Sequence, residues 1–187
     1  EEGLLVNSEL SGNTGSFRWS SNAMDVIGFG HIDAYVNAWA YRAFRNAAAL
    51  FSDLSDEAAS ARAMALADGL RAAYARELLN PETGWIAGWK SRDGRLHDYA
   101  FLWINGPALA FGLLDDRAAA TALHRLEDLR ARVGLGSARA GFPCNLLPIA
   151  EGDHMLGRIQ AGGASQPTFE NYTDGGMNGN AGHYLLA

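Results

Sequence analysis

The stretch from Ile32 to about Phe51 constrains the fold of this chain more than any other part of the sequence. Apolar residues recur there with the i, i+3, i+4, i+7 spacing of an α-helix, and the positions between them are mostly alanine. A helix that is apolar or small on nearly every side is stable in water only when other helices surround it. The sequence therefore predicts an inner helix over 32–51 of a mainly helical domain.

A second helix with a different character is predicted from Ser55 to about Leu79. Ser55 is expected to cap this helix, and Asp56 and Glu57 lie in its first turn, where the helix dipole favours acidic side chains. One face of the helix is apolar and the arginines lie elsewhere. This amphipathic pattern is typical of an outer helix that packs on one side only.

The same order of elements then repeats. An Asp93-Gly94 turn between two short extended runs, 85–90 and 95–99, predicts a β-hairpin. Asn105 is expected to cap a second inner helix, which ends near Leu114.

A second outer helix is expected to start at the cap Asp115, with Ala119, Leu123, Leu126 and Leu129 on its buried face. A Gly- and Pro-rich stretch follows over 134–176, too long for a plain connection, so we expect it to be functional. A third inner-type helix is expected to begin near Asn178.

The alternation of inner and outer helices indicates stacked αα-hairpins, in units covering residues 32–105 and 106–178. Such hairpins need neighbours to bury their apolar faces, and closing a ring supplies them. The predicted fold is therefore all-α, an α/α toroid seen as a partial ring of about two and a half hairpins with a short β-hairpin in one loop. The whole span 1–187 is taken as one domain. Its apolar last residues predict that the domain continues beyond Ala187, and a start before Glu1 stays open.

Composition narrows the classes of ligand. The net charge of −6 argues against nucleic acid, and no apolar run has the eighteen or so residues of a membrane helix. The single Cys144 excludes an internal disulfide framework and a thiolate zinc site. The histidines show no close ligand spacing, so neither a metal nor another cofactor is expected.

In a ring of hairpins, the segments that precede the inner helices emerge at one end and line a common cleft. These segments carry aromatic, carboxylate and amide side chains, which together suit a sugar: rings stack on pyranose faces, and polar groups bind hydroxyls. They include Trp19, His31, Trp85, Trp89, His97, Asp98, Tyr99, Trp103, Asn105, Tyr172, Asp174 and Asn178.

For several of these residues a purely structural role stays open as an alternative. Trp85 and Trp89 face the same side of a strand and form either a stacking platform or hairpin core. Trp103 either lines the cleft or packs under the helix that follows it. Asp174 with its two following glycines is also an ordinary turn sequence.

Several segments, taken in order, resemble six-hairpin glycosidases. They are Trp19 followed by 31–44, the run 80–85, Asp98 followed by 105–113, and the segments 141–143 and 172–184. The resemblance covers nearly the whole chain and about half of the family's ring. Two positions depart from the family: Trp19 has no acidic neighbour, with Asp25 the nearest carboxylate downstream, and Asp174 stands where the family usually has Asn.

The resemblance implies a glycoside hydrolase that cleaves an oligosaccharide with two carboxylic acids, usually with inversion. Asp98 and Asp25 are then the candidate catalytic residues. Trp85, Trp89 and Tyr172 would stack on sugar rings, and Asn105, Asp174 and Asn178 would bind hydroxyls, in a cleft that Trp19, His31 and Trp103 also line. In the family the second carboxylate often lies in a later hairpin, beyond Ala187, so the rest of the ring would be a partner.

Two other functions stay open. The absence of an acid beside Trp19 favours a toroid that binds glycan without cutting it. A sugar lyase or epimerase on the same fold would need a base and a group that neutralises a uronate, and Tyr99, His97 and Arg95 supply these side-chain types.

Overall fold

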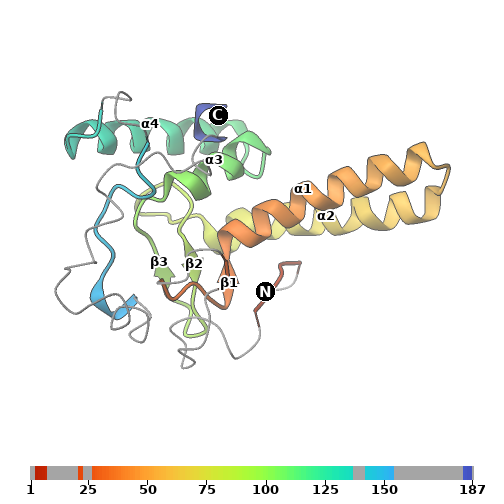
Figure 1. The fold of residues 1–187 in the computed structure, drawn as a ribbon, viewed down its shortest axis with the longest axis horizontal. Coiled ribbons are helices and arrows are strands. Elements are labelled where there is room, and N and C mark those ends of the chain that lie inside the picture. The colour runs from red at the N-terminus through yellow and green to blue at the C-terminus, as the bar shows by residue number, and fades with distance from the viewer. Residues whose placement is uncertain (1–2, 8–20, 23–26, 137–141, 154–182, 187) are drawn as a thin grey trace.

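The computed structural model describes residues 3–7, 21–22, 27–136, 142–153 and 183–186. These residues form four α-helices and one small antiparallel sheet (Figure 1), so the domain is mostly helical, which is compatible with the predicted all-α class. The helices are α1 (Ala34–Asp53), α2 (Glu57–Leu78), α3 (Leu102–Ala110) and α4 (Asp116–Arg132); the strands are β1 (Ile32–Asp33), β2 (Trp89–Lys90) and β3 (Leu96–His97); η2 (Glu151–Asp153) is a 3₁₀ turn. None of the helices in these ranges is long and apolar enough to cross a membrane.

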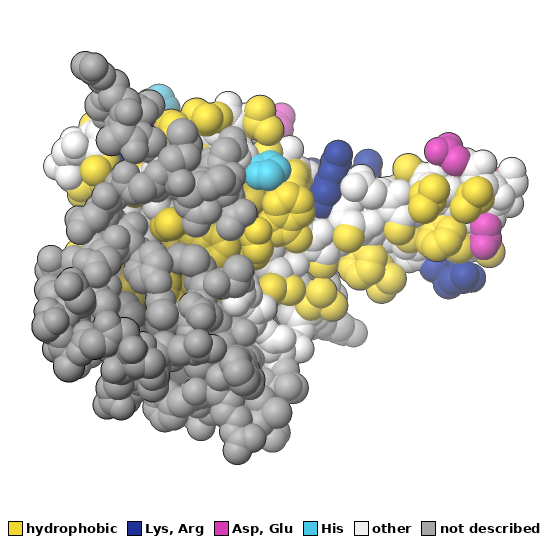
Figure 2. Space-filling model, viewed as in Figure 1, with side chains coloured by type: hydrophobic (Ala, Val, Ile, Leu, Met, Phe, Trp, Pro, Cys, Tyr) yellow, Lys and Arg dark blue, Asp and Glu magenta, His cyan; other side chains and the backbone are white. Residues whose placement is uncertain are grey.

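Helices α1 and α2 form an antiparallel pair that projects from the rest of the molecule (Figure 1). Figure 2 shows hydrophobic side chains on the surface of this projection, and Leu50, Leu54 and Leu66 are each more than half exposed. The prediction that α1 is enclosed on nearly every side is therefore not met within the described residues. Helix α1 packs along α2, and near its start Tyr35 and Trp39 also contact Trp103 and Phe111 of the α3 region. The described residues thus enclose only part of α1.

The helix starts differ from the prediction by a few residues, for identifiable reasons. Ile32 and Asp33 pair with β2 as strand β1, so α1 begins at Ala34 with Asp33 as its N-cap. Ser55, expected to cap α2, instead has a positive φ of 61°. Its neighbour Asp56 is the N-cap and accepts the backbone N–H of Ala59 at 3.0 Å.

The β-hairpin is confirmed, but the cap expected at Asn105 is wrong. Helix α3 begins at Leu102, because the apolar residues before Asn105 already form its buried first turn. Asn105 lies inside the helix, where its side chain accepts the N–H of Ile86 at 2.9 Å and donates to the carbonyls of Ile86 at 3.0 Å and Phe101 at 2.9 Å. The amide thus ties the loop before the hairpin to α3.

Helix α4 matches its prediction well. Asp115 caps it by accepting the N–H of Ala118 at 2.8 Å. Its buried residues are Ala122, Leu126 and Leu129, while the predicted Ala119 and Leu123 are half-buried against the core. The third inner helix expected near Asn178 falls mainly outside the described residues. At the described end of the chain, Tyr184 is buried and Leu185 is exposed.

The core lies where the sheet meets the starts of α1 and α3. Phe29, Trp89, Phe101 and Trp103 are fully buried and pack ring against ring, with Phe29 centroids 4.5 Å from Trp89 and 5.4 Å from Phe101. Gly88 is required here, because a Cβ atom at this position would lie 2.5 Å from the Phe101 ring. The close aromatic packing fixes the hairpin against the two helix starts.

Candidate functional site

The segments that precede α1 and α3 meet in the three-stranded sheet. β1, which leads into α1, pairs with β2, placing Asp33 opposite Trp89; β2 pairs with β3, placing Trp89 opposite His97. The first residue of α1 adds a further bond, from the Ala34 N–H to the Gly88 carbonyl at 3.0 Å. The two segments thus lie side by side in one sheet. We call these paired segments, together with the side chains bonded to them, the rim; that they line a common cleft at one end of a ring stays a prediction.

Asp98, the candidate general acid, is the acceptor of a dense set of hydrogen bonds on the rim. One oxygen, Oδ2, accepts Asn80 Nδ2 at 2.8 Å and Thr83 Oγ1 at 2.9 Å. The other, Oδ1, accepts Trp85 Nε1 at 2.7 Å and the Ala100 N–H at 3.0 Å. Asp98 is only half-buried. It therefore organises the loop before the hairpin while part of the residue stays open to solvent.

Asp33 is a second carboxyl on the rim, and sequence reasoning did not select it. Its Oδ1 caps α1 by accepting the N–H of Tyr35 at 2.8 Å and of Val36 at 3.2 Å. Its Oδ2 accepts Asn22 Nδ2 at 2.7 Å and the Ser21 hydroxyl. Burial raises the pKa of Asp33 above its ordinary value, although these hydrogen bonds oppose the rise. The signal available in the sequence was an Asp directly before a strong helical pattern.

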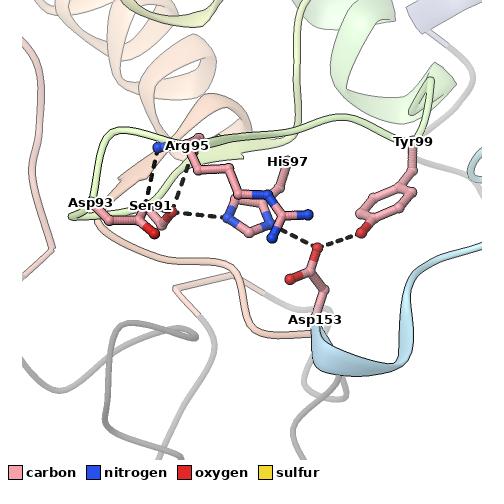
Figure 3. Close-up of polar contacts among 6 residues, drawn as sticks. All are labelled: Ser91, Asp93, Arg95, His97, Tyr99 and Asp153. Atoms are coloured by element: carbon pink, nitrogen blue, oxygen red, sulfur yellow. Dashed lines mark hydrogen bonds and ion pairs between the residues drawn. The ribbon is translucent and has the colours of Figure 1, made fainter.

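His97 is the centre of a second polar network on the rim (Figure 3). Its Nδ1 lies 2.7 Å from Oδ2 of Asp153, and its Nε2 lies 2.9 Å from Oγ of Ser91. The Tyr99 hydroxyl donates to the same Asp153 oxygen. The imidazole also stacks on Trp89, with centroids 4.5 Å apart and planes at 5°. We call Ser91, His97, Tyr99 and Asp153 the His97 network.

Hydrogen bonds link Ser91 to His97 and His97 to Asp153, as in a hydrolase triad. The hydrogen bonding of Ser91 nevertheless does not suit a nucleophile. The Ser91 hydroxyl has one proton, and its shortest contact is Oδ1 of Asp93 at 2.5 Å. A charge-assisted bond of this length holds the proton away from His97. Ser91 is also only 4% exposed. The network instead joins the hairpin to the 3₁₀ turn at Asp153.

The titration behaviour of the network follows from its burial. Burial tends to raise the pKa of Asp153, but the hydrogen bonds from His97 and Tyr99 outweigh it and lower that pKa. Burial raises the pKa of Tyr99 well above its ordinary value, and its bond to Asp153 raises it further. Tyr99 is therefore a proton donor here and a poor base, which weakens its assignment as the base of a lyase.

The structure places the other sequence-predicted residues as follows. Trp85 is buried apart from a small fraction and uses its indole N–H on Asp98. Trp89 and Trp103 are fully buried, in agreement with the hairpin-core and helix-packing alternatives. Asn105 is fully buried, and His31 is 8% exposed with a positive φ of 46°.

For all of these residues, contact with a sugar stays a prediction. Five other predicted positions lie outside the described residues: Trp19, Asp25, Tyr172, Asp174 and Asn178. Across the described ranges, no three His, Cys, Asp or Glu side chains converge as metal ligands. Scans of this chain against protein-family models, curated proteins and solved structures gave no match.

Proposed function

We propose that the chain is a partial α/α toroid of a carbohydrate-active domain, which cleaves a glycosidic bond in an oligosaccharide by carboxylate acid–base catalysis. The observation that carries the proposal is the meeting of the segments before α1 and α3 in one sheet. This pairing gathers aromatic residues and three carboxyls, Asp33, Asp98 and Asp153, at the rim. Aromatic rings with several carboxyls are the side chains that sugar cleavage uses.

Asp98 is the described carboxyl that suits a catalytic role best. Asp33 and Asp153 are almost fully buried, whereas Asp98 is only half-buried. Two of the groups bonded to Asp98 are the polar side chains of Asn80 and Thr83, which hold the carboxyl in place. Glycosidic cleavage needs a second carboxyl, and Asp25, selected from the sequence, stays the candidate for that role.

Hydrolysis stands ahead of its two alternatives. A lyase or epimerase would use Tyr99 or His97 as base, but Tyr99 donates its proton to Asp153 and the side chain of His97 is enclosed by Trp89, Ser91 and Asp153. A glycan-binding module without activity would show the same rim and would differ only in releasing no product.

The experiment is to incubate the full chain with malto-, cello- and xylo-oligosaccharides and to measure both binding and the release of new reducing ends. We expect release by the wild type and its loss in Asp98→Asn, while the control Asp68→Asn on the exposed side of α2 behaves as wild type. If Asp98→Asn does not fold, Thr83→Val removes one Asp98 contact conservatively and is expected to lower the rate. Binding without release would overturn hydrolysis in favour of the binding module. Unsaturated products from a uronate-containing oligosaccharide would favour the lyase.

A further inference from the structure

A cleft lies on the outer side of the loop that Asp98 organises. This cleft of about 660 Å³ separates residues 82–85 from the C-terminal half of α4. A smaller cleft of about 260 Å³ separates residues 79–84 from the N-terminal half of α4. Arg125 lines both clefts. Both clefts lie between α4 and the loop 79–85, and we call the two together the α4 groove.

Arg125 is fixed in the middle of this groove. Its Nη1 donates to the carbonyls of Thr83 at 2.9 Å and Glu82 at 3.3 Å. Gly84 allows this approach, because its φ is +80° and a Cβ atom there would lie 2.9 Å from Nη1. Among the described residues, no partner engages the Nε and Nη2 groups of Arg125. A guanidinium held in place with donors to spare is a preorganised ligand contact.

The other charged residues that line the groove also have polar groups available to a ligand. Glu82, Asp128 and Arg132 are exposed, and within the described part of the chain their charged groups form no hydrogen bond or ion pair. Trp85 contributes only a small exposed part of its side chain to the lining, and its orientation is set by the bond from its indole N–H to Asp98 at 2.7 Å. The groove thus offers mainly planar donors and acceptors.

The charges of the larger cleft identify the class of ligand. Two carboxylates, Glu82 and Asp128, balance two guanidinium groups, Arg125 and Arg132. A polyanion would meet the carboxylates and a polycation the arginines, each at a cost in like-charge repulsion. A neutral, elongated molecule with many hydroxyls satisfies both kinds of group along the groove.

We propose that the α4 groove is a second glycan-binding site, outside the rim, that holds a neutral oligosaccharide. The choice of a sugar rests on the function proposed above, and the site itself rests on the groove. Trp85 and Thr83 connect the two sites, because both line the larger cleft and both donate to Asp98.

The test is calorimetric titration of the full chain with neutral malto-, cello- and xylo-oligosaccharides. The variant Asp128→Asn/Arg132→Gln changes two exposed groove residues, and Asp68→Asn/Arg71→Gln makes the same changes on the exposed side of α2. We expect the groove variant to weaken binding at one site about tenfold or more, the loss expected when a hydrogen bond to a charged group is removed. The α2 variant should bind as wild type.

Two results would overturn the proposal: neutral oligosaccharides bind equally to the groove variant and the wild type, or no oligosaccharide binds at all. The two proposals fail separately. Loss of product release in Asp98→Asn, with binding insensitive to the groove variant, would reject the groove alone. Binding that depends on the groove without any product release would reject hydrolysis alone.

Discussion

Replacing Asp153 by Asn is expected to destabilise the fold markedly, because this carboxylate holds two buried side chains at once. Its Oδ2 lies 2.7 Å from His97 Nδ1 and also accepts the Tyr99 hydroxyl, and all three residues are largely buried. A hydrogen bond to a charged group contributes about 1.5–3 kcal/mol. Asn keeps one acceptor of similar shape and weakens both bonds, so we place the loss of unfolding free energy at about 3 kcal/mol.

The same carboxyl makes stability depend on acid. The folded state lowers the pKa of Asp153 below its ordinary value of 3.8. Its contribution is therefore present above that value and is lost as the pH falls through the lowered folded pKa. The Asn variant has no such group, so the difference in stability between wild type and variant should shrink as the pH is lowered into this range.

Urea unfolding at neutral pH and along an acid series measures both effects. Asp68→Asn on the exposed side of α2 is the matched control and is expected to change stability by less than about 0.5 kcal/mol. If Asp153→Asn were as mild as this control, or if its deficit stayed constant down to acid pH, the account of the His97 network would be wrong.

Three further substitutions test the observed helix starts by urea unfolding. Asn105→Leu should cost about 3 kcal/mol, because it removes three buried hydrogen bonds to the backbone of Ile86 and Phe101; a loss below about 1 kcal/mol would contradict the tie between loop and helix. Asp56→Ala should cost about 1 kcal/mol as the loss of an N-cap. Ser55→Ala should cost clearly less, and the opposite ranking would restore the cap predicted from sequence.

The helices and the hairpin could be predicted because their signals are local. The spacing of apolar residues, the Asp93-Gly94 turn and the cap at Asp115 all act over a few neighbouring residues, and each corresponds to an observed element. The error at Ser55 arose because two neighbouring polar residues could cap one helix, and Asp56 is the one that does so. At Asn105 the error was of another kind: no side chain caps α3, whose N-cap is Phe101, and the Asn105 amide bonds to the backbone of Ile86 and Phe101 instead.

The contacts of the site are less local and could not be read in the same way. Asp153 bonds to a histidine 56 residues earlier in the chain, and a lone Asp in a Gly- and Pro-rich stretch gives no sign of such a partner. Strand β1 is only two residues long, too short for an alternating pattern to show against the helix that follows it. The role of Trp89 could not be predicted either, because an aromatic residue in a strand has the same sequence signature in a core as on a binding surface.

The most direct test of the central claim is a map of backbone amide NMR shifts during titration with the oligosaccharide that binds best. The account predicts that the residues shifting most cluster at the rim, in β1, in the hairpin and around Asp98, with a second set along the α4 groove. The far end of the α1–α2 pair should stay unchanged. Shifts confined to that far end, or spread evenly over the chain, would contradict a sugar site built from the segments that precede α1 and α3.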